Sequence, residues 1–232
     1  TFICNKKVFV RLGPVGHPDG YSTVLGTYQK FTSLPAAGSG NVNKLAKVSG
    51  DDIDNFTPYW VISTQEGTTY FWKESVNPNI SNQLDNSTMP FELTKEPTGR
   101  FVFGSAPWEP RRVGDEETLP MPLFVNRTIN HIFFFRGRLG LIADENVILS
   151  RADNVYGFFA EKATTVLDTD PIDRTVSTEK VSILLFASPL RKTLFLTSAA
   201  MQFELSSGDT LMSSKTASLD PTTTYTASAI CA

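Results

Sequence analysis

Hydrophobic and polar residues alternate along most of the chain with a period of two, which is the pattern of half-buried β-strands. Tyr59–Thr64 and Thr68–Glu74 flank a turn that contains Gly67, so these two segments predict a β-hairpin. Further strands are predicted at Phe91–Thr94, Arg100–Phe103, Val147–Leu149, Val155–Phe159, Val181–Ala187, Thr193–Ser198 and Met201–Leu205. Helical periodicity is scarce and predicts only short helices, one within Gly40–Phe56 and one within Phe124–Ile132.

The segment NHIFFFRGRLGLIADE, residues 130–145, contains the most apolar run of the chain. We expect Ile132–Ile142 to form one interior strand that carries an Arg-Gly pair near its middle. Strict alternation would place Phe133, Phe135 and Gly137 on one face, and Phe134, Arg136 and Arg138 on the other. A glycine inside a strand indicates a bend or the close approach of a neighbouring backbone.

Many short strands, long loops and few helices predict an all-β fold, and within that class a single jelly-roll β-sandwich with short helices and extended terminal segments. The expected organisation is an N-terminal extended segment at 1–56, holding either the first strands or an arm, a jelly-roll core at 57–207 and a C-terminal surface tail at 208–232. No run of 18 apolar residues occurs, so no transmembrane helix is expected.

The composition points to a protein whose surface is partly covered by partners. Charged residues make up 19% of the 232 residues, hydrophobic residues make up 41%, and there are 17 phenylalanines. The formal net charge of -3 argues against attraction of the whole protein to nucleic acid. The chain starts without Met and without the pattern of a signal peptide, which suggests a processed product or a trimmed chain.

Catalytic and metal-binding chemistry has little support in the sequence. His17 and His131 each lack a second histidine at metal-ligand spacing, which excludes the ligand set of a cupin. The three aspartates of Ser49–Asn55 resemble a calcium loop only loosely, and a solvated loop is the better interpretation. Asp115–Glu117 is interpreted as a surface loop and Glu109–Arg112 as a surface ion pair. We therefore expect no enzyme, no catalytic residue, no metal ligand and no cofactor.

Two cysteines and three glycosylation sequons complete the candidate chemistry. A bridge between Cys4 and Cys231 is possible, although free thiols are the preferred interpretation. The sequons begin at Asn79, Asn86 and Asn126, and chance matches in a chain rich in Ser, Thr and Asn explain them best.

The segment LPMPLFVNRTINHIFFFRGRLGLIADE and, after it, KVSILLFASPLRKTLFLTSAAMQFEL resemble the central and last strands of capsid proteins of picorna-like viruses, with the small coat proteins of plant secovirid viruses as the nearest match. The resemblance covers residues 119–205 and implies a jelly roll of the viral capsid type. It also implies a structural coat subunit of a small icosahedral positive-strand RNA virus. Its partners would be other capsid subunits in a pseudo-T=3 shell, with weak non-specific contact to genomic single-stranded RNA and none to membranes. It would be located in the virion and, during assembly, in the host cytoplasm.

The two ends and two rival functions complete these expectations. Phe2–Leu12 alternates but has no neighbour in sequence to pair with, so we expect contacts outside its own barrel or at the barrel edge to order it. The tail Gly208–Ala232 is expected to be disordered in a lone monomer. The first rival function is a secreted carbohydrate-binding β-sandwich that uses Tyr59, Trp60, Tyr70 and Trp72 as a stacking platform. Alternation places Tyr59 and Trp60 on opposite faces, which favours burial over a platform. A cupin-like enzyme is the second rival.

Overall fold

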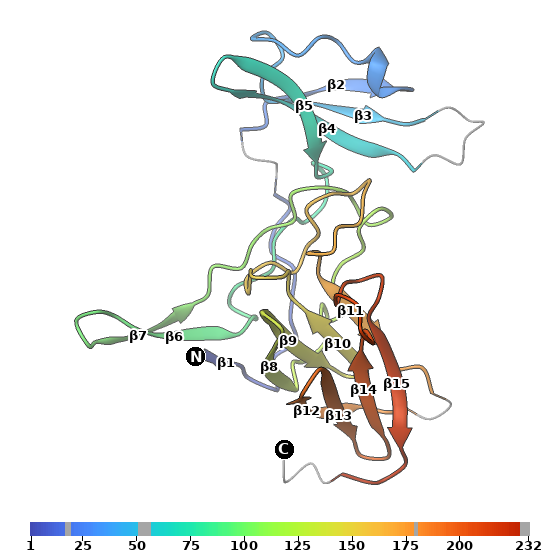
Figure 1. Ribbon diagram of the computed structural model, residues 1–232. Coiled ribbons are helices and arrows are strands. Elements are labelled where there is room, and N and C mark those ends of the chain that lie inside the picture. The colour runs from blue at the N-terminus through green and yellow to red at the C-terminus, as the bar shows by residue number, and fades with distance from the viewer. Residues whose placement is uncertain (17–19, 51–56, 179–180, 228–232) are drawn as a thin grey trace.

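The computed structural model describes residues 1–16, 20–50, 57–178 and 181–227, which form four β-sheets and almost no helix. Two four-stranded antiparallel sheets make up the lower body in Figure 1. The first sheet has the order β11-β10-β9-β8 and contains β8 (His131–Phe135), β9 (Arg138–Ala143), β10 (Asn146–Leu149) and β11 (Ile172–Thr175). The second has the order β12-β13-β14-β15 and contains β12 (Leu184–Leu190), β13 (Thr193–Ser198), β14 (Gln202–Ser206) and β15 (Ser218–Thr223).

These two sheets pack face to face around the main hydrophobic core. Alternate residues of β13 and β14 are buried, so each strand turns one face toward the opposite sheet. The buried side chains of this core include Phe133, Phe135, Ile142, Val147, Leu149, Ile172, Leu184, Leu194, Leu196, Phe203 and Leu205. Burial of this apolar surface is the main stabilising contribution to the sandwich.

The sheet that contains β9 is buried on both faces, because a second core covers its outer side. Leu139, Leu141 and Ile148 point into this second core, where Trp108, Phe124, Ile129, Phe158 and Phe159 cover them. Every residue of β9 and β10 is buried as a result. A strand covered on both sides needs no polar face, which explains the nearly continuous apolar composition of residues 139–143.

The N-terminal segment belongs to this second core, so the contacts that order it lie outside the interior of the sandwich, as expected for Phe2–Leu12. Val10 is completely buried, and its backbone exchanges hydrogen bonds with Asn126 and Arg127. Isolated bridges also join Phe9 to Thr128 and Leu12 to Leu84. Its pairing partners are therefore in the same chain, but more than 70 residues away in sequence.

A third sheet lies at the far end of the molecule, at the top of Figure 1. Its order is β2-β3-β4-β5, formed by β2 (Thr23–Tyr28), β3 (Lys44–Val48), β4 (Tyr59–Glu66) and β5 (Thr69–Ser75). The predicted hairpin is confirmed as β4 and β5, with Gly67 at a φ of 59° in the turn. A small core of Ala46, Val48 and Val61 lies on one face. Two of its strands precede residue 57 and two follow it, although the boundary between an N-terminal extended segment and the jelly-roll core was expected at this residue.

The fourth sheet is an arm that projects sideways from the body in Figure 1. It has the order β1-β6-β7, and its strands are β1 (Phe2–Ile3), β6 (Phe91–Lys95) and β7 (Phe101–Ser105). β6 and β7 form an antiparallel hairpin, and the short β1 pairs only with the part of β6 that is nearest the body. The outer part of the arm is therefore two strands wide.

The Arg-Gly pair lies in a turn, so the prediction of one continuous strand over Ile132–Ile142 is wrong. Phe135 pairs with Arg138, and the two residues between them form a tight hairpin loop. Arg136 and Gly137 have φ values of 49° and 71°, the pair of left-handed conformations that a type I′ turn requires. Arg136 donates hydrogen bonds to the Lys192 carbonyl (2.6 Å) and the Ser207 hydroxyl (3.2 Å), which attach the loop to the opposite sheet.

The hairpin also corrects the predicted faces. Because Phe135 and Arg138 are directly paired, Gly140 and Ile142 share a face with Phe133, and Leu139 points to the opposite face. A continuous strand would have placed Leu139 on the same face as Phe133 and Phe135. Phe134 lies opposite Phe133 and Phe135, as predicted, and its ring is exposed. Contrary to the prediction, Arg138 does not share the face of Phe134 but lies on the face of Phe135.

Other predictions from the sequence also fail. The single jelly roll is not confirmed, because the strands of each sandwich sheet are consecutive meanders and do not have the order of two Greek keys. Residues 124–130 form turns and isolated bridges and residues 131–132 begin β8, while residues 40–50 contain β3, so the described part of neither segment forms an α-helix. The only helix in the described ranges is the 3₁₀ turn Phe31–Ser33. None of the described helices is long and apolar enough to cross a membrane.

The C-terminal tail is also ordered over part of its length, which corrects the prediction of a disordered segment. β15 pairs with β14 along the outer edge of its sheet. Pro221 lies in β15, and an edge strand tolerates a proline because its outward side needs no N–H donor. Residues 228–232, including Cys231, lie outside the described residues, as do His17 and the aspartates at positions 51, 52 and 54.

The ring of Phe133 packs directly against the Cα of Gly140, in the space that a side chain at position 140 would fill. We therefore expect Gly140→Ala to lower the free energy of unfolding by about 2 kcal/mol. A Cβ atom at this position would lie 2.1 Å from the Phe133 ring, which must then leave the core position it fills. Urea unfolding measures the effect. Gly104→Ala is the matched control, because a Cβ there meets nothing within 4 Å. A double variant that also carries Phe133→Leu should recover part of the loss, and an unchanged cost would show that the ring is not the cause.

Candidate assembly surfaces

The histidine and carboxylates considered from the sequence occupy structural positions. The His131 ring lies 4.4 Å from the Phe186 ring, and burial lowers the pKa of this imidazole. Asp115 accepts hydrogen bonds from the backbone of Glu117 and Thr118 and so closes its own turn. Within the described ranges, no cluster of three or more His, Cys, Asp or Glu side chains is arranged to hold a metal ion.

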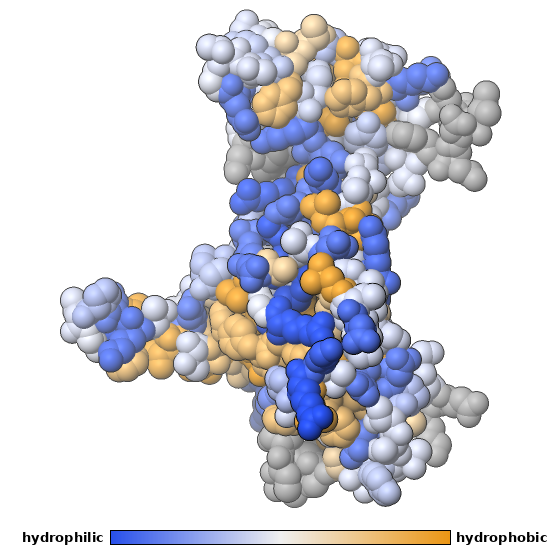
Figure 2. All heavy atoms as spheres, in the orientation of Figure 1, coloured by the Kyte–Doolittle hydropathy of each residue, from blue (hydrophilic) through white to orange (hydrophobic). Residues whose placement is uncertain are grey.

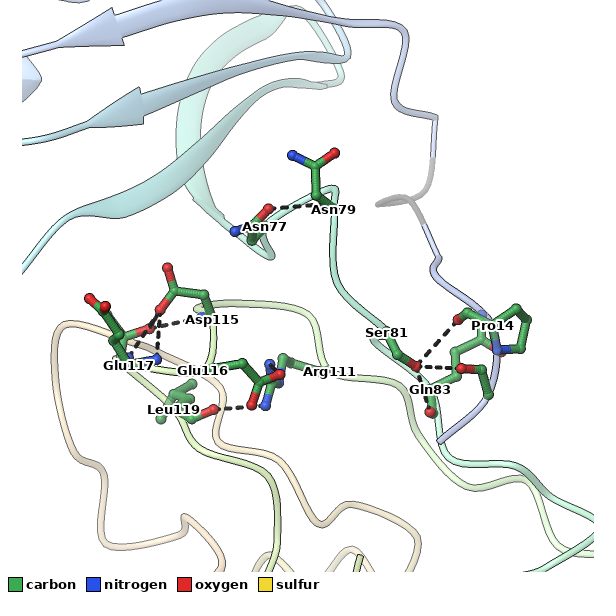
Figure 3. A network of polar contacts seen from close by, with 12 residues as sticks. Pro14, Asn77, Asn79, Ser81, Gln83, Arg111, Asp115, Glu116, Glu117 and Leu119 are labelled. Atoms are coloured by element: carbon green, nitrogen blue, oxygen red, sulfur yellow. Dashed lines mark hydrogen bonds and ion pairs between the residues drawn. The ribbon is translucent and has the colours of Figure 1, made fainter. Parts of the chain in front are cut away.

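Arg111 lies at the junction between the body and the far sheet, and it corrects the interpretation of Glu109–Arg112 as a surface ion pair. Its guanidinium is fully buried, donates to the Leu119 carbonyl (2.8 Å) and to Glu116 (3.2 Å), and packs against the Phe159 ring. Figure 3 shows Arg111 between the 115–119 loop and the segment that contains Ser81. The Ser81 hydroxyl donates a hydrogen bond of 2.7 Å to the Gly13 carbonyl. This bond joins the two segments of the chain that connect the body to the far sheet.

A cleft of about 660 Å³ lies between β4–β5 and the segments 110–113 and 161–164. On one side of this cleft, Glu74 of β5 connects the far sheet to the body, because its carboxylate accepts hydrogen bonds from the Ala163 N–H and the Thr164 hydroxyl. Lys73, Arg112 and Lys162 also line the cleft, so both signs of charge are present. The arrangement fixes the far sheet against the body through polar contacts at a small number of points.

Arg138 is the most highly connected buried cation in the described part of the sandwich. It is 2% exposed and donates hydrogen bonds to the carbonyls of Ser150 (2.7 Å), Asp170 (2.7 Å) and Asp168 (2.9 Å). Burial lowers the pKa of this guanidinium, while Asp153 and Asp170 act in the opposite direction. The side chain thus attaches the long loop between β10 and β11 to the first residue of β9.

Asp173 in β11 is a largely buried carboxylate with incomplete hydrogen bonding. One oxygen accepts from the Leu123 N–H at 2.8 Å, whereas the other is buried and has no partner among the described residues. Burial raises the pKa of Asp173 to about 6, and the opposing effects of the Leu123 N–H, Arg174 and Arg127 are smaller. This carboxyl group therefore titrates between mildly acidic and neutral pH.

The four aromatic residues proposed as a sugar platform do not share one face. Strand pairing places Trp72 opposite Ser63 and Tyr70 opposite Gln65, on the same side of the sheet as Tyr59. Trp60 is on the other side, as alternation predicted. Trp72 packs into the small core of the far sheet and donates from its indole nitrogen to the Pro35 carbonyl at 2.9 Å. Trp72 is therefore held in place by its own sheet.

The arm carries an exposed apolar surface that the strand pairing defines. Ile3 pairs with Phe91, and Leu93 pairs with Phe103, so these four side chains lie on one face together with Phe101. Phe101 and Phe103 are 62% and 58% exposed, and Ile3 is 45% exposed. Figure 2 shows hydrophobic residues gathered along the lower side of the arm and at its base. We call these five residues the apolar face of the arm. Its opposite side turns Phe2 toward Trp108 and Glu92 toward the Tyr156 hydroxyl.

The apolar face of the arm is partly visible in the sequence as alternation of apolar residues in two neighbouring segments. Alternation along Phe101–Phe103 and Phe91–Leu93 predicts two strands with an apolar side each. It does not predict that the hairpin leaves the body, since that depends on which residues cover it. Arg111, Arg138 and Asp173 gave no signal, because their burial is set by segments distant in sequence.

Comparison with known proteins supplies a family. A family model described as bacteriophage nozzle protein matches residues 18–232. The chain is also similar to the tail tubular protein gp12 of Escherichia phage T7, with 36% identity over 197 residues. That alignment covers 85% of this chain and 24% of the relative, so the chain spans about a quarter of the length of the curated protein it matches.

Proposed function

Since the chain belongs to the bacteriophage nozzle protein family, we propose that it forms part of the wall of a phage tail, where it packs against copies of itself and against other virion proteins. The family match over residues 18–232 is the observation that carries the proposal. A structural role in the virion follows from the family, and the finer statements about the tail wall and its contacts are the proposal.

The family also corrects the resemblance found in the sequence. The picorna-like coat protein, with its pseudo-T=3 shell and its contact to genomic RNA, is wrong, because the matching family is a phage nozzle family. The general expectation of an all-β structural protein of a virion is correct. Both viral classes require β-rich subunits that bury apolar surface against neighbours, which explains why composition and alternation did not separate them.

Two properties of the molecule support a wall-forming role. The described residues leave large apolar side chains exposed at many points, including Phe9, Phe31, Phe101, Phe103, Phe134, Leu190 and Leu211. Surfaces of this kind are typical of proteins that bury them in an assembly. The buried polar groups, Arg111 and Arg138, are occupied by structural contacts, and the proposal assigns no catalytic step, metal or cofactor to the chain.

The location of the chain in particles tests the proposal. Purified particles of the phage that encodes the chain are labelled with gold-conjugated antibodies raised against it, and tails separated from heads are analysed by mass spectrometry. We expect label at the tail and recovery of the chain with the tail fraction. Label confined to the head, or absence of the chain from particles, would contradict the proposal.

A further inference from the structure

We propose that the apolar face of the arm binds a second copy of this chain, side to side, in the assembled tail. This inference rests on the proposed function, because it names the partner and the surface through which the wall is built. The face consists of Ile3, Phe91, Leu93, Phe101 and Phe103. In the described part of the chain Ile3, Phe101 and Phe103 are exposed, and Phe91 and Leu93 are half-buried.

The arm is not a self-sufficient unit in the isolated chain. Its outer part is two strands wide, and a two-stranded hairpin is marginally stable in water unless another element covers one face. The Phe91 and Phe103 rings stack at 5.2 Å, which buries only part of each ring. At its base the opposite side of the sheet is already occupied, since Phe2 packs against Trp108 there. Further out, Val102 is the exposed large apolar side chain on that side, so the apolar face of the arm is the larger apolar surface that is available to a partner.

The free edge of the arm adds a second reason for contact with another chain. β7 pairs only with β6, so its outer backbone groups have no strand partner among the described residues. Natural edge strands are commonly protected by proline or charge. The edge strands β12 and β15 contain Pro189 and Pro221, whereas β7 has the sequence FVFGS and contains neither proline nor charge.

Three observations favour a second copy as the occupant. The arm extends sideways from the long axis of the molecule (Figure 1), so its apolar face lies away from the body, where a neighbouring copy can reach it. Residues 91–105 contain two basic and two acidic residues, so this part of a chain with net charge -3 approaches an identical copy without net repulsion. The third observation is the size of the apolar face.

The exposed apolar area of the face is on the order of 300 Å², from the fractional exposure of side chains that each bury about 200 Å² at most. A stable interface between two proteins buries about 800 Å² on each partner. One arm contact is therefore too small to hold an independent pair together. Head-to-tail contacts that close into a ring avoid this difficulty, because every copy is then held by two neighbours. Each copy inserts its own arm into one neighbour and binds the arm of the other neighbour with a different surface.

Self-association of the purified full chain tests the inference, with sedimentation velocity over a range of concentrations as the measurement. We expect Phe101→Ser combined with Phe103→Ser to weaken self-association at least tenfold. The matched control combines Val102→Ser with Thr94→Ser, which alters a paired couple on the opposite face of the same two strands and should leave association unchanged. Circular dichroism establishes that both variants keep the parent fold.

A photo-reactive phenylalanine analogue at position 103 identifies the occupant in assembled tails. We expect crosslinks between two copies of this chain. Crosslinks only to a different virion protein would overturn the inference, as would a parent chain that stays monomeric or equal association of parent and double variant. The proposed function fails on a separate result, the absence of the chain from tails, so the two failures are distinguishable.

Discussion

Replacing Arg138 with alanine is expected to lower the free energy of unfolding by about 4 kcal/mol. The guanidinium donates to the carbonyls of Ser150, Asp168 and Asp170, and it is buried where water cannot replace it. Removal of the side chain leaves these carbonyls without a donor and opens a cavity at the start of β9. A hydrogen bond that involves a charged group contributes about 1.5–3 kcal/mol, so the loss of these three bonds and of a longer one to the Thr169 carbonyl (3.3 Å) is only partly offset by local rearrangement.

Two further substitutions separate the role of the fork geometry from that of the charge. Arg138→Lys keeps a cation but cannot reach all three carbonyls, so we expect an intermediate loss of about 2 kcal/mol. Arg100→Ala removes an exposed arginine that pairs with Glu96, and it should change stability by less than about 0.5 kcal/mol. Urea unfolding followed by tryptophan fluorescence gives all three values. A loss below about 1 kcal/mol for Arg138→Ala would contradict the role assigned to this side chain.

The second large effect is a pH dependence that originates at Asp173. The pKa of this carboxyl rises from an ordinary value of 3.8 to about 6 in the folded protein. The folded state therefore holds the proton more tightly than the unfolded state. Stability from this group is present below about pH 4 and is lost as the pH rises through about 6. A rise of about two pKa units corresponds to about 3 kcal/mol.

Asp173→Asn removes the charge and keeps an oxygen to accept from the Leu123 N–H. The stability advantage of the variant over the parent should therefore grow by about 3 kcal/mol between about pH 4 and about pH 8. Asp209→Asn is the matched control for the loss of one carboxylate, since Asp209 is exposed and pairs with Lys192 at the surface. Guanidinium unfolding at both pH values provides the measurement, and a constant difference for Asp173→Asn would refute a buried, titrating carboxylate.

Local pattern in the sequence predicted most strands, and the reasons are visible in β13 and β4. Thr193–Ser198 alternates between buried and half-buried residues and was predicted with both of its ends correct. The hairpin at Gly67 was found because a glycine separates two alternating segments. In both cases the information lies within about ten residues, so a period of two and a turn residue were sufficient.

The Arg-Gly hairpin shows where that reasoning fails. The favoured type I′ pairs are Asn-Gly and Asp-Gly, and an arginine in the first position lacks this signal. In this protein Arg136 is held in its left-handed conformation by bonds to the opposite sheet, and those partners lie more than 50 residues away. Because β9 is buried on both faces, its apolar residues also gave no indication that the faces had been exchanged.

The candidate surface was harder to predict than the fold. Strand pairing puts Ile3 beside Phe91, although the two residues are far apart in sequence, and only this contact completes the apolar face. Arg111 and Asp173 look like ordinary surface charges in the sequence. Their burial depends on distant loops, and no alternation encodes which loop covers which charge.

In sequence, the far sheet lies between the N-terminal segment and the residues with which that segment pairs, so the ribosome makes the far sheet before the second core can close. The Val10 backbone pairs with residues 126 and 127, so the second core lacks its partners until more than 110 further residues have been synthesised. At about 5–20 residues per second, the interval is on the order of ten seconds. Loop closure itself takes well under a millisecond. During this interval the β2–β5 sheet leaves the ribosome complete, whereas Phe2 and Val10, which the second core later covers, stay exposed. The time needed to complete the second core is therefore set by the speed of translation and not by diffusion of the chain.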